Sequence, residues 1–205
     1  CRSYDFFGKS GKDRLKIKNS EIWYQKCNEE GSLIAYVKEE YSFGQKKASL
    51  YLNYKAMSPI FDEIGDFYID WKNQSITYFA VNKKNHTFAL WQNKKKISID
   101  FPYYTNLDIA PEVFIDRPYS NLGDAGIIRS FSNGKVYYYV YGRIKDSFLK
   151  LKLYKNNEVI YSTPSPAGNI YLAPAYSEED SRINFCYDLY DDPKKKVYYI
   201  SIPSS

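Results

Sequence analysis

The sequence predicts an all-β fold made of four repeated units, and three observations support this prediction. Short apolar and aromatic runs of strand length alternate with polar turns, and no stretch sustains the 3.6-residue periodicity of a helix. A tight polar turn followed by two such runs occurs four times, anchored on Ser32, Ser75, Lys135 and Arg182, at spacings of 43, 60 and 47 residues. A β-only period of about 40 to 50 residues is typical of propeller blades. We therefore expect a four-bladed β-propeller-like domain, with a β-sandwich or an open β-sheet repeat as the alternative.

The units follow one another in a single domain that is expected to span residues 14–205. The second and third units cover about 64–100 and 125–163, and the fourth ends with a strand at 196–202. The fourth unit is one strand short of the others. The first unit shows four strand-like runs, at about 20–27, 32–40, 47–54 and 56–61.

A short alternating run from Leu15 to Lys18 precedes the first unit and has no partner strand of its own. Its alternation places Leu15 and Ile17 on one face of a strand. An N-terminal strand that completes the last blade would join the two ends of the chain and remove a free sheet edge. We expect Leu15–Lys18 to close the last blade in this way.

The segment 101–124 does not fit the repeat and is expected to be an irregular insertion. Long insertions inside a compact domain are often functional. This one combines aromatic side chains and an arginine, the types that dominate binding hot spots, with two carboxylates that can orient a polar ligand. The alternative is that the aromatic rings fill the central channel or hold the loop against a sheet. The candidate partner-binding residues are Tyr103, Tyr104, Glu112, Phe114, Asp116, Arg117 and Tyr119.

Composition argues against several classes of protein. Aromatic residues make up 19% of the 205 residues, and the 23 tyrosines suit half-buried sheet faces and the seams between blades. The net charge of +5 comes from lysines scattered over turns and edges, with acidic residues among them. A nucleic-acid interface needs a clustered basic face, so nucleic acid is not an expected partner. No run reaches the roughly 20 apolar residues of a membrane-spanning helix.

No catalytic motif is present in the sequence. The spacings of nucleophile elbows, zinc proteases, dinucleotide-binding loops and P-loops are all missing, and His86 is the single imidazole. Neither a cofactor nor a metal is expected. A small glycoside hydrolase remains an alternative, because propeller glycosidases use acids from different blades. Its candidate carboxylates are Asp70, Asp100, Asp108, Glu112, Asp116 and Asp124.

Binding is therefore the expected function, with another protein as the partner of the propeller loops and no enzymatic activity. A carbohydrate-binding, lectin-like module is the second possibility, because exposed aromatic rings also stack on sugars. Trp23, Trp71 and Trp91 are the natural candidates for that role, although they fall in or near strands.

The first residues resemble those of a mature bacterial lipoprotein. The sequence begins with Cys1 followed by Arg2, and the polar stretch up to Asp13 has the composition of a flexible tether, so residues 1–13 are expected to space the domain from a membrane. The resemblance implies lipid on Cys1 as the only membrane contact and a location in the bacterial cell envelope. Arg2 is not the aspartate that signals inner-membrane retention, which favours the outer membrane, facing the periplasm or the cell surface.

The two remaining cysteines, Cys27 and Cys186, are even in number, and an oxidising compartment can pair them. In a closed ring the first and last units are neighbours, so a disulfide is geometrically conceivable. Buried free cysteines are also common. The sequence therefore allows either a disulfide between them or two free thiols.

The first half of each unit resembles the blade repeat of TolB-like propellers, in which a strand is followed by Ser-Pro-Asp-Gly-Lys and an Ile-Ala-Phe-type strand. Asn28–Tyr36 and Ser177–Phe185 are the nearest copies, and Ser132–Val136 is a third. Lys72–Ile76 lacks the glycine, and the proline is missing from all four. The resemblance covers most of residues 20–202. It implies a scaffold with protein-binding relatives in the envelope and carries no catalytic residues.

Overall fold

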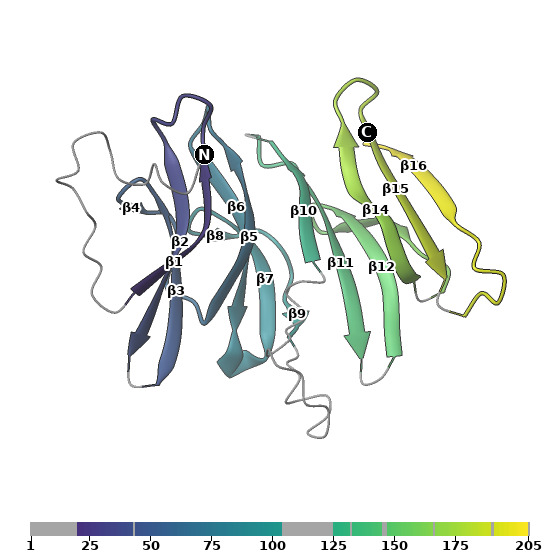
Figure 1. Ribbon diagram of the computed structural model, residues 1–205, viewed down its shortest axis with the longest axis horizontal. Helices are drawn as coiled ribbons and strands as arrows, with labels where there is room; N and C mark the ends of the chain where they lie inside the picture. The colour runs from purple at the N-terminus through teal and green to yellow at the C-terminus, as the bar shows by residue number, and fades with distance from the viewer. Residues whose placement is uncertain are drawn as a thin grey trace.

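The computed structural model describes residues 20–42, 44–103, 125–131, 133–144, 147–165, 167–189 and 191–204. Within them the regular structure is β, arranged in four antiparallel sheets that follow one another along the chain, and no α-helix occurs. The prediction of an all-β fold is confirmed. The sheets stand side by side in a row, the first at the left and the last at the right of Figure 1.

The first two sheets are meanders in which each strand pairs with the next one along the chain. Sheet 1 contains β1 (Ser20–Cys27), β2 (Ile34–Ser42), β3 (Gln45–Leu52) and β4 (Lys55–Ala56). Sheet 2 contains β5 (Glu63–Asp70), β6 (Ser75–Asn82), β7 (Thr87–Gln92) and β8 (Lys95–Lys96), and the short β9 (Phe101–Pro102) also pairs with β7. A single 3₁₀ turn, η1 (Lys83–Asn85), links β6 to β7.

The last two sheets repeat this order. Sheet 3 contains β10 (Ala125–Ser130), β11 (Val136–Ile144), β12 (Ser147–Lys155) and β13 (Glu158–Ser162). Sheet 4 contains β14 (Ala167–Ser177), β15 (Arg182–Leu189) and β16 (Tyr198–Pro203), one strand fewer than the others among the described residues. The four units expected from the sequence correspond to these four sheets.

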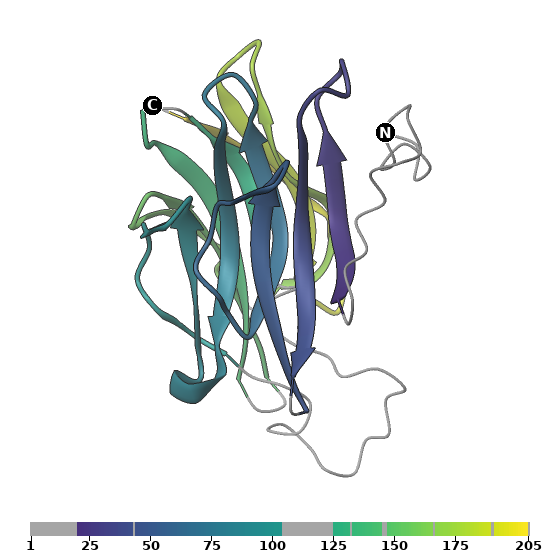
Figure 2. The ribbon, with the colours of Figure 1, turned by 90° about the vertical axis from the view of Figure 1, so that its left-hand side faces the viewer.

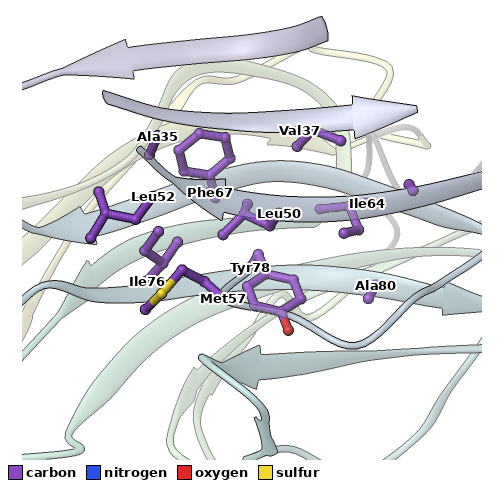
Figure 3. Packing of buried hydrophobic residues seen from close by; sticks show 11 residues of the cluster. Ala35, Val37, Leu50, Leu52, Met57, Ile64, Phe67, Ile76, Tyr78 and Ala80 are labelled. Carbon is purple, nitrogen blue, oxygen red and sulfur yellow. The ribbon is translucent and has the colours of Figure 1, made fainter. Parts of the chain in front are cut away.

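Clusters of buried side chains fill the three junctions between neighbouring sheets. In the first junction Val37 and Leu50 of sheet 1 face Phe67 and Tyr78 of sheet 2 (Figure 3). β6 is buried on both sides, because alternate residues of a strand point to opposite faces: Tyr78 belongs to the first junction and Phe79 to the second. A sheet inside the row therefore needs two apolar faces.

Aromatic rings dominate the other two junctions. In the second, Tyr138 stacks on Tyr154 with ring centroids 4.9 Å apart, and Phe101 packs edge-on against both. In the third, Tyr137 of sheet 3 is buried in the same cluster as Phe185 of sheet 4. Tyrosines thus line these seams between sheets, as the composition indicated.

The row is open within the described residues. No buried cluster of the described part of the chain joins sheet 1 to sheet 4, and Figure 1 shows these sheets at opposite ends, with sheet 1 nearest the viewer in Figure 2. The expected closing strand, Leu15–Lys18, lies outside the described residues. In the described ranges, no helix has the length and apolarity needed to cross a bilayer.

Asparagine holds the turn after the third strand in sheets 1, 2 and 3. Each asparagine adopts a left-handed φ of 50–55°, which this residue type tolerates, and donates its backbone N–H to the carbonyl at the start of the second strand. Its side-chain Oδ1 accepts the N–H of that same residue. The pairs are Asn53 with Ile34, Asn93 with Ile76 and Asn156 with Val136, with Oδ1 to N distances of 2.8, 3.0 and 3.0 Å.

A buried hydroxyl then satisfies the outer edge of the third strand. In each case it accepts the N–H of a leucine whose carbonyl oxygen accepts the backbone N–H of the residue directly after the fourth strand. The hydroxyls replace the longer fourth strand that would otherwise be needed to cover this edge. The pairs are Ser58 with Leu50 at 2.8 Å, Ser98 with Leu90 at 2.7 Å and Thr163 with Leu151 at 3.1 Å.

Sheet 4 departs from this pattern at its outer edge. Ser204 takes the place of the turn asparagine and donates its backbone N–H to the carbonyl oxygen of Ser181 at 2.9 Å. Ser201, three residues earlier, corresponds to Leu50 of sheet 1. The guanidinium of Arg182 donates to the carbonyl oxygen and the hydroxyl of Ser201 at 2.8 and 2.7 Å. An arginine thus supplies the donor that a fourth strand supplies elsewhere.

Replacing Asn93 by alanine should lower the free energy of unfolding by about 1–3 kcal/mol, measured by urea denaturation. The variant leaves the Ile76 N–H without its acceptor and places a less tolerant residue at positive φ. Asn93→Asp keeps both an acceptor oxygen and the tolerance of that conformation, so it should retain most of the stability. Equal losses in the two variants would contradict the role assigned to the side-chain oxygen.

Candidate functional site

The first strand of every sheet carries a β-bulge. The pairing of the first strand with the second shifts between Trp23 and Lys26 in β1, and β5 and β10 have equivalent shifts that end at Phe67 and Arg129. β14 has three such shifts. Bulges re-aim side chains and are frequent beside functional sites. The side of the molecule formed by β1, β5, β10 and β14, here called the first-strand face, is therefore the candidate site.

A cavity of about 460 Å³ opens between β1 and β5 on this face. Its size lies within the range of ligand-binding pockets. The ammonium group of Lys26 donates to the backbone carbonyl of Phe67 and lies 4.9 Å from the centroid of its ring. The cavity is lined by Gln25, Lys26, Cys27, Phe67, Tyr68, Ile69 and Trp71.

Arg129 extends this surface across sheets 2, 3 and 4. Its guanidinium carbon lies 5.7 Å from the ring centroid of Tyr68 in β5, 5.5 Å from Phe131 and 5.9 Å from Tyr176 in β14. It also forms an ion pair with Glu178. Because Tyr68 lines the cavity as well, the cavity and the arginine cluster form one continuous aromatic and cationic surface.

Two tyrosines of this surface have shifted acidities. Burial raises the pKa of Tyr68; the carboxylates of Asp70 and Glu178 add to the effect, while Arg129 opposes it. The pKa of Tyr176 is lowered, because hydrogen bonds with Ser181 and Ser204 and the nearby positive charges outweigh burial. The hydroxyl of Tyr68 therefore keeps its proton more firmly than that of an exposed tyrosine.

The structure describes one of the seven predicted partner-binding residues. Tyr103 is 3% exposed, packs in the second junction and donates its hydroxyl to Glu63 at 2.8 Å. It thus follows the alternative interpretation of the insertion, in which an aromatic ring packs against a sheet. The others, Tyr104, Glu112, Phe114, Asp116, Arg117 and Tyr119, lie outside the described residues, as does Cys1.

Among the described residues, the cysteines singled out in the sequence are unpaired thiols, and the carboxylates make contacts with residues close to them in the chain. Cys27 and Cys186 are free thiols, in sheets 1 and 4 respectively. Asp70 accepts two hydrogen bonds from Asn73 in a turn, and Asp100 forms an ion pair with Lys96. Within the described ranges, no group of three or more His, Cys, Asp or Glu side chains is placed to share a metal ion.

Sequence reasoning missed Lys26, Tyr68, Arg129 and Tyr176. One signal was available, because Arg129 interrupts the apolar run of Ile127 and Ile128 inside a predicted strand. The bulges that aim these side chains leave no mark in the hydrophobic pattern.

Comparison of the chain with protein-family models, with curated proteins and with solved structures finds no match.

Proposed function

We propose that this protein is a non-enzymatic binding protein of the bacterial cell envelope. Its four sheets are the blades of a propeller-like scaffold, and its first-strand face binds another protein. One observation carries the proposal: Arg129 and Tyr68 join residues of three bulged first strands into a single surface beside a cavity. Arginine, tyrosine and tryptophan are the residue types that carry most binding energy at protein interfaces. Trp71 and Tyr68 at the cavity are half-buried and offer such contacts.

The interpretation as propeller blades is supported by the repeated turns. Sheets 1, 2 and 3 use the same asparagine and hydroxyl contacts at the same strand ends, as expected of copies of one structural unit. Each sheet also packs face to face on the next. Closure of the last blade by Leu15–Lys18 is part of the proposal. Because sheet 1 begins at Ser20, closure requires sheets 1 and 4 to come together as neighbours, in place of the open row described above. The strand would then compete with Arg182 at the edge of β16.

Deleting residues 1–18 should lower the melting temperature by several degrees and promote aggregation, whereas deleting residues 1–12 should change little. The longer deletion removes two apolar side chains, Leu15 and Ile17, and exposes a strand edge. Thermal unfolding followed by circular dichroism measures the difference. Identical melting of the full chain and both truncated chains would rule out closure by this strand.

Lipid on Cys1 would hold the scaffold at the outer membrane, with residues 1–13 as its tether. Mass spectrometry of the N-terminal peptide, from protein purified from native membranes, should show a diacylglyceryl or triacyl modification. Cys1→Ser should release the protein from the membrane fraction. An unmodified N-terminal peptide, with no change in fractionation for Cys1→Ser, would remove the anchoring part of the proposal.

The protein-binding proposal is tested by affinity capture from solubilised envelope, quantified by mass spectrometry. We expect a partner that wild type retains and that Tyr68→Ala and Arg129→Ala each weaken by about tenfold, a loss equivalent to about 1.4 kcal/mol. Tyr41→Ala is the matched control, because Tyr41 is an exposed tyrosine of β2, outside the first-strand face. All variants are first compared by melting temperature. If folded Tyr68→Ala and Arg129→Ala retain the partner as well as wild type does, the proposal is contradicted.

A further inference from the structure

A second cavity, of about 750 Å³, lies where the turns β3–β4, β5–β6 and β7–β8 of sheets 1 and 2 meet. We call it the amide hollow, because side-chain amides come from all three turns. Its polar lining consists of Asn53, Tyr54, Lys55, Asn73, Gln74 and Asn93. None of these residues takes part in the contacts described for the first-strand face.

The fold fixes two of the amides. Asn53 and Asn93 use their Oδ1 atoms to accept backbone N–H groups of Ile34 and Ile76, as described above. Their orientation is therefore set by the turns themselves. Within the described residues, the Nδ2 groups of both asparagines have no acceptor, so each leaves two N–H donors for a ligand.

Asn73 presents the complementary group. Its Nδ2 donates to Asp70 at 2.8 Å, which leaves Oδ1 as an acceptor. Gln74, in the same turn, has an exposed side chain and a left-handed φ of 48°. Its amide contributes one more donor and one more acceptor. The hollow thus offers a ligand both hydrogen-bond donors and acceptors.

The hollow also has an aromatic wall and an apolar floor. Tyr54 is 74% exposed, which is high for so large a ring, and it lies in the turn directly after Asn53. Leu52 and Met57 beneath it are 5% and 8% exposed. A ligand in the hollow would therefore find a flat apolar surface beside the fixed amides.

This combination points to one ligand chemistry. A saccharide hydroxyl both donates and accepts, so neighbouring hydroxyls are matched by amides that do the same. The C–H face of a pyranose ring is apolar and packs against an aromatic ring. An anionic ligand would need several cations, and Lys55 is the one cationic group in the polar lining of the hollow. We infer that the amide hollow binds a saccharide unit, stacked on Tyr54 and held through its hydroxyls by the amides of Asn53, Asn73, Gln74 and Asn93.

The inference goes beyond the proposed function and is independent of it, because it concerns another ligand class and other residues. Neither the tryptophans considered for sugar binding in the sequence nor the segment 101–124 is part of it. Trp71 and Trp91 instead pack against the first junction.

The test is a glycan array of neutral and uronic-acid-containing oligosaccharides, followed by titration calorimetry of the bound structures. Tyr54→Ala and Gln74→Ala should each weaken binding by about tenfold or more. Asn53 and Asn93 are left unchanged because their substitution would disturb the turns. Tyr41→Ala is the matched control, since Tyr41 is also exposed but lies at the other end of sheet 1, where β2 turns into β3. It should bind like wild type, as should Tyr68→Ala.

Three outcomes would overturn the inference. The first is the lack of binding to any glycan at millimolar concentration. The second is binding that Tyr54→Ala and Gln74→Ala leave unchanged in folded protein. The third is binding confined to acidic glycans and lost only in Lys55→Ala, which would show simple charge attraction. Loss of saccharide binding in Tyr54→Ala with retention of the captured protein partner would separate the two sites.

Discussion

The row of sheets depends on how the outer edge of each third strand is satisfied. β4 and β8 contain only two residues each, too few to pair with the whole neighbouring strand. Unpaired backbone groups in a buried edge would each cost free energy, about 1–3 kcal/mol. A hydroxyl just beyond the fourth strand supplies the missing acceptor, so short strands suffice and the chain can turn at once toward the next sheet. The turn asparagine meanwhile ties the end of the third strand to the start of the second.

This arrangement leaves the faces of the sheets free to pack. Sheets 2 and 3 are apolar on both faces, with consecutive residues such as Tyr137 and Tyr138 serving different junctions. The outward faces of sheets 1 and 4 are more polar. Lys38 pairs with Glu40 on one, and Asn184 accepts hydrogen bonds from Ser201 and Tyr199 on the other. A polar outer face on the flanking units is what keeps stacked repeats soluble.

The same architecture separates scaffold from recognition. The second and third strands carry most of the buried clusters, whereas the bulged first strands and the turns carry the two candidate surfaces. Arg129 also links sheets 2, 3 and 4, so its contacts contribute to packing as well as to the proposed interface. Glu178, 68% exposed, adds little to stability because exposed ion pairs are screened by water and salt. In the amide hollow, Asn53 and Asn93 hold the turns with one end of the amide and face a ligand with the other.

The sequence by itself determined the all-β class, the four units and most of the strands within them, because alternation of apolar residues and polar turns are local signals. The fourth strand of the first unit, expected at 56–61, is instead the two-residue β4, since the hydroxyl of Ser58 takes over the edge there. The bounds of β1 were predicted correctly, and sheet 4 has one strand fewer than the others within the described residues, as expected. Only the tertiary structure decided which side chains meet. Arg129 finds Tyr68 and Tyr176 because three strands distant in sequence lie side by side, and bulges set the register there. Tyr103 is buried for the same kind of reason, since the ring fills a junction that exists only once sheets 2 and 3 have packed together. Strand formation depends on residues that are close in the sequence. The register, the junctions between sheets and the sites depend on contacts between units, which no local pattern encodes.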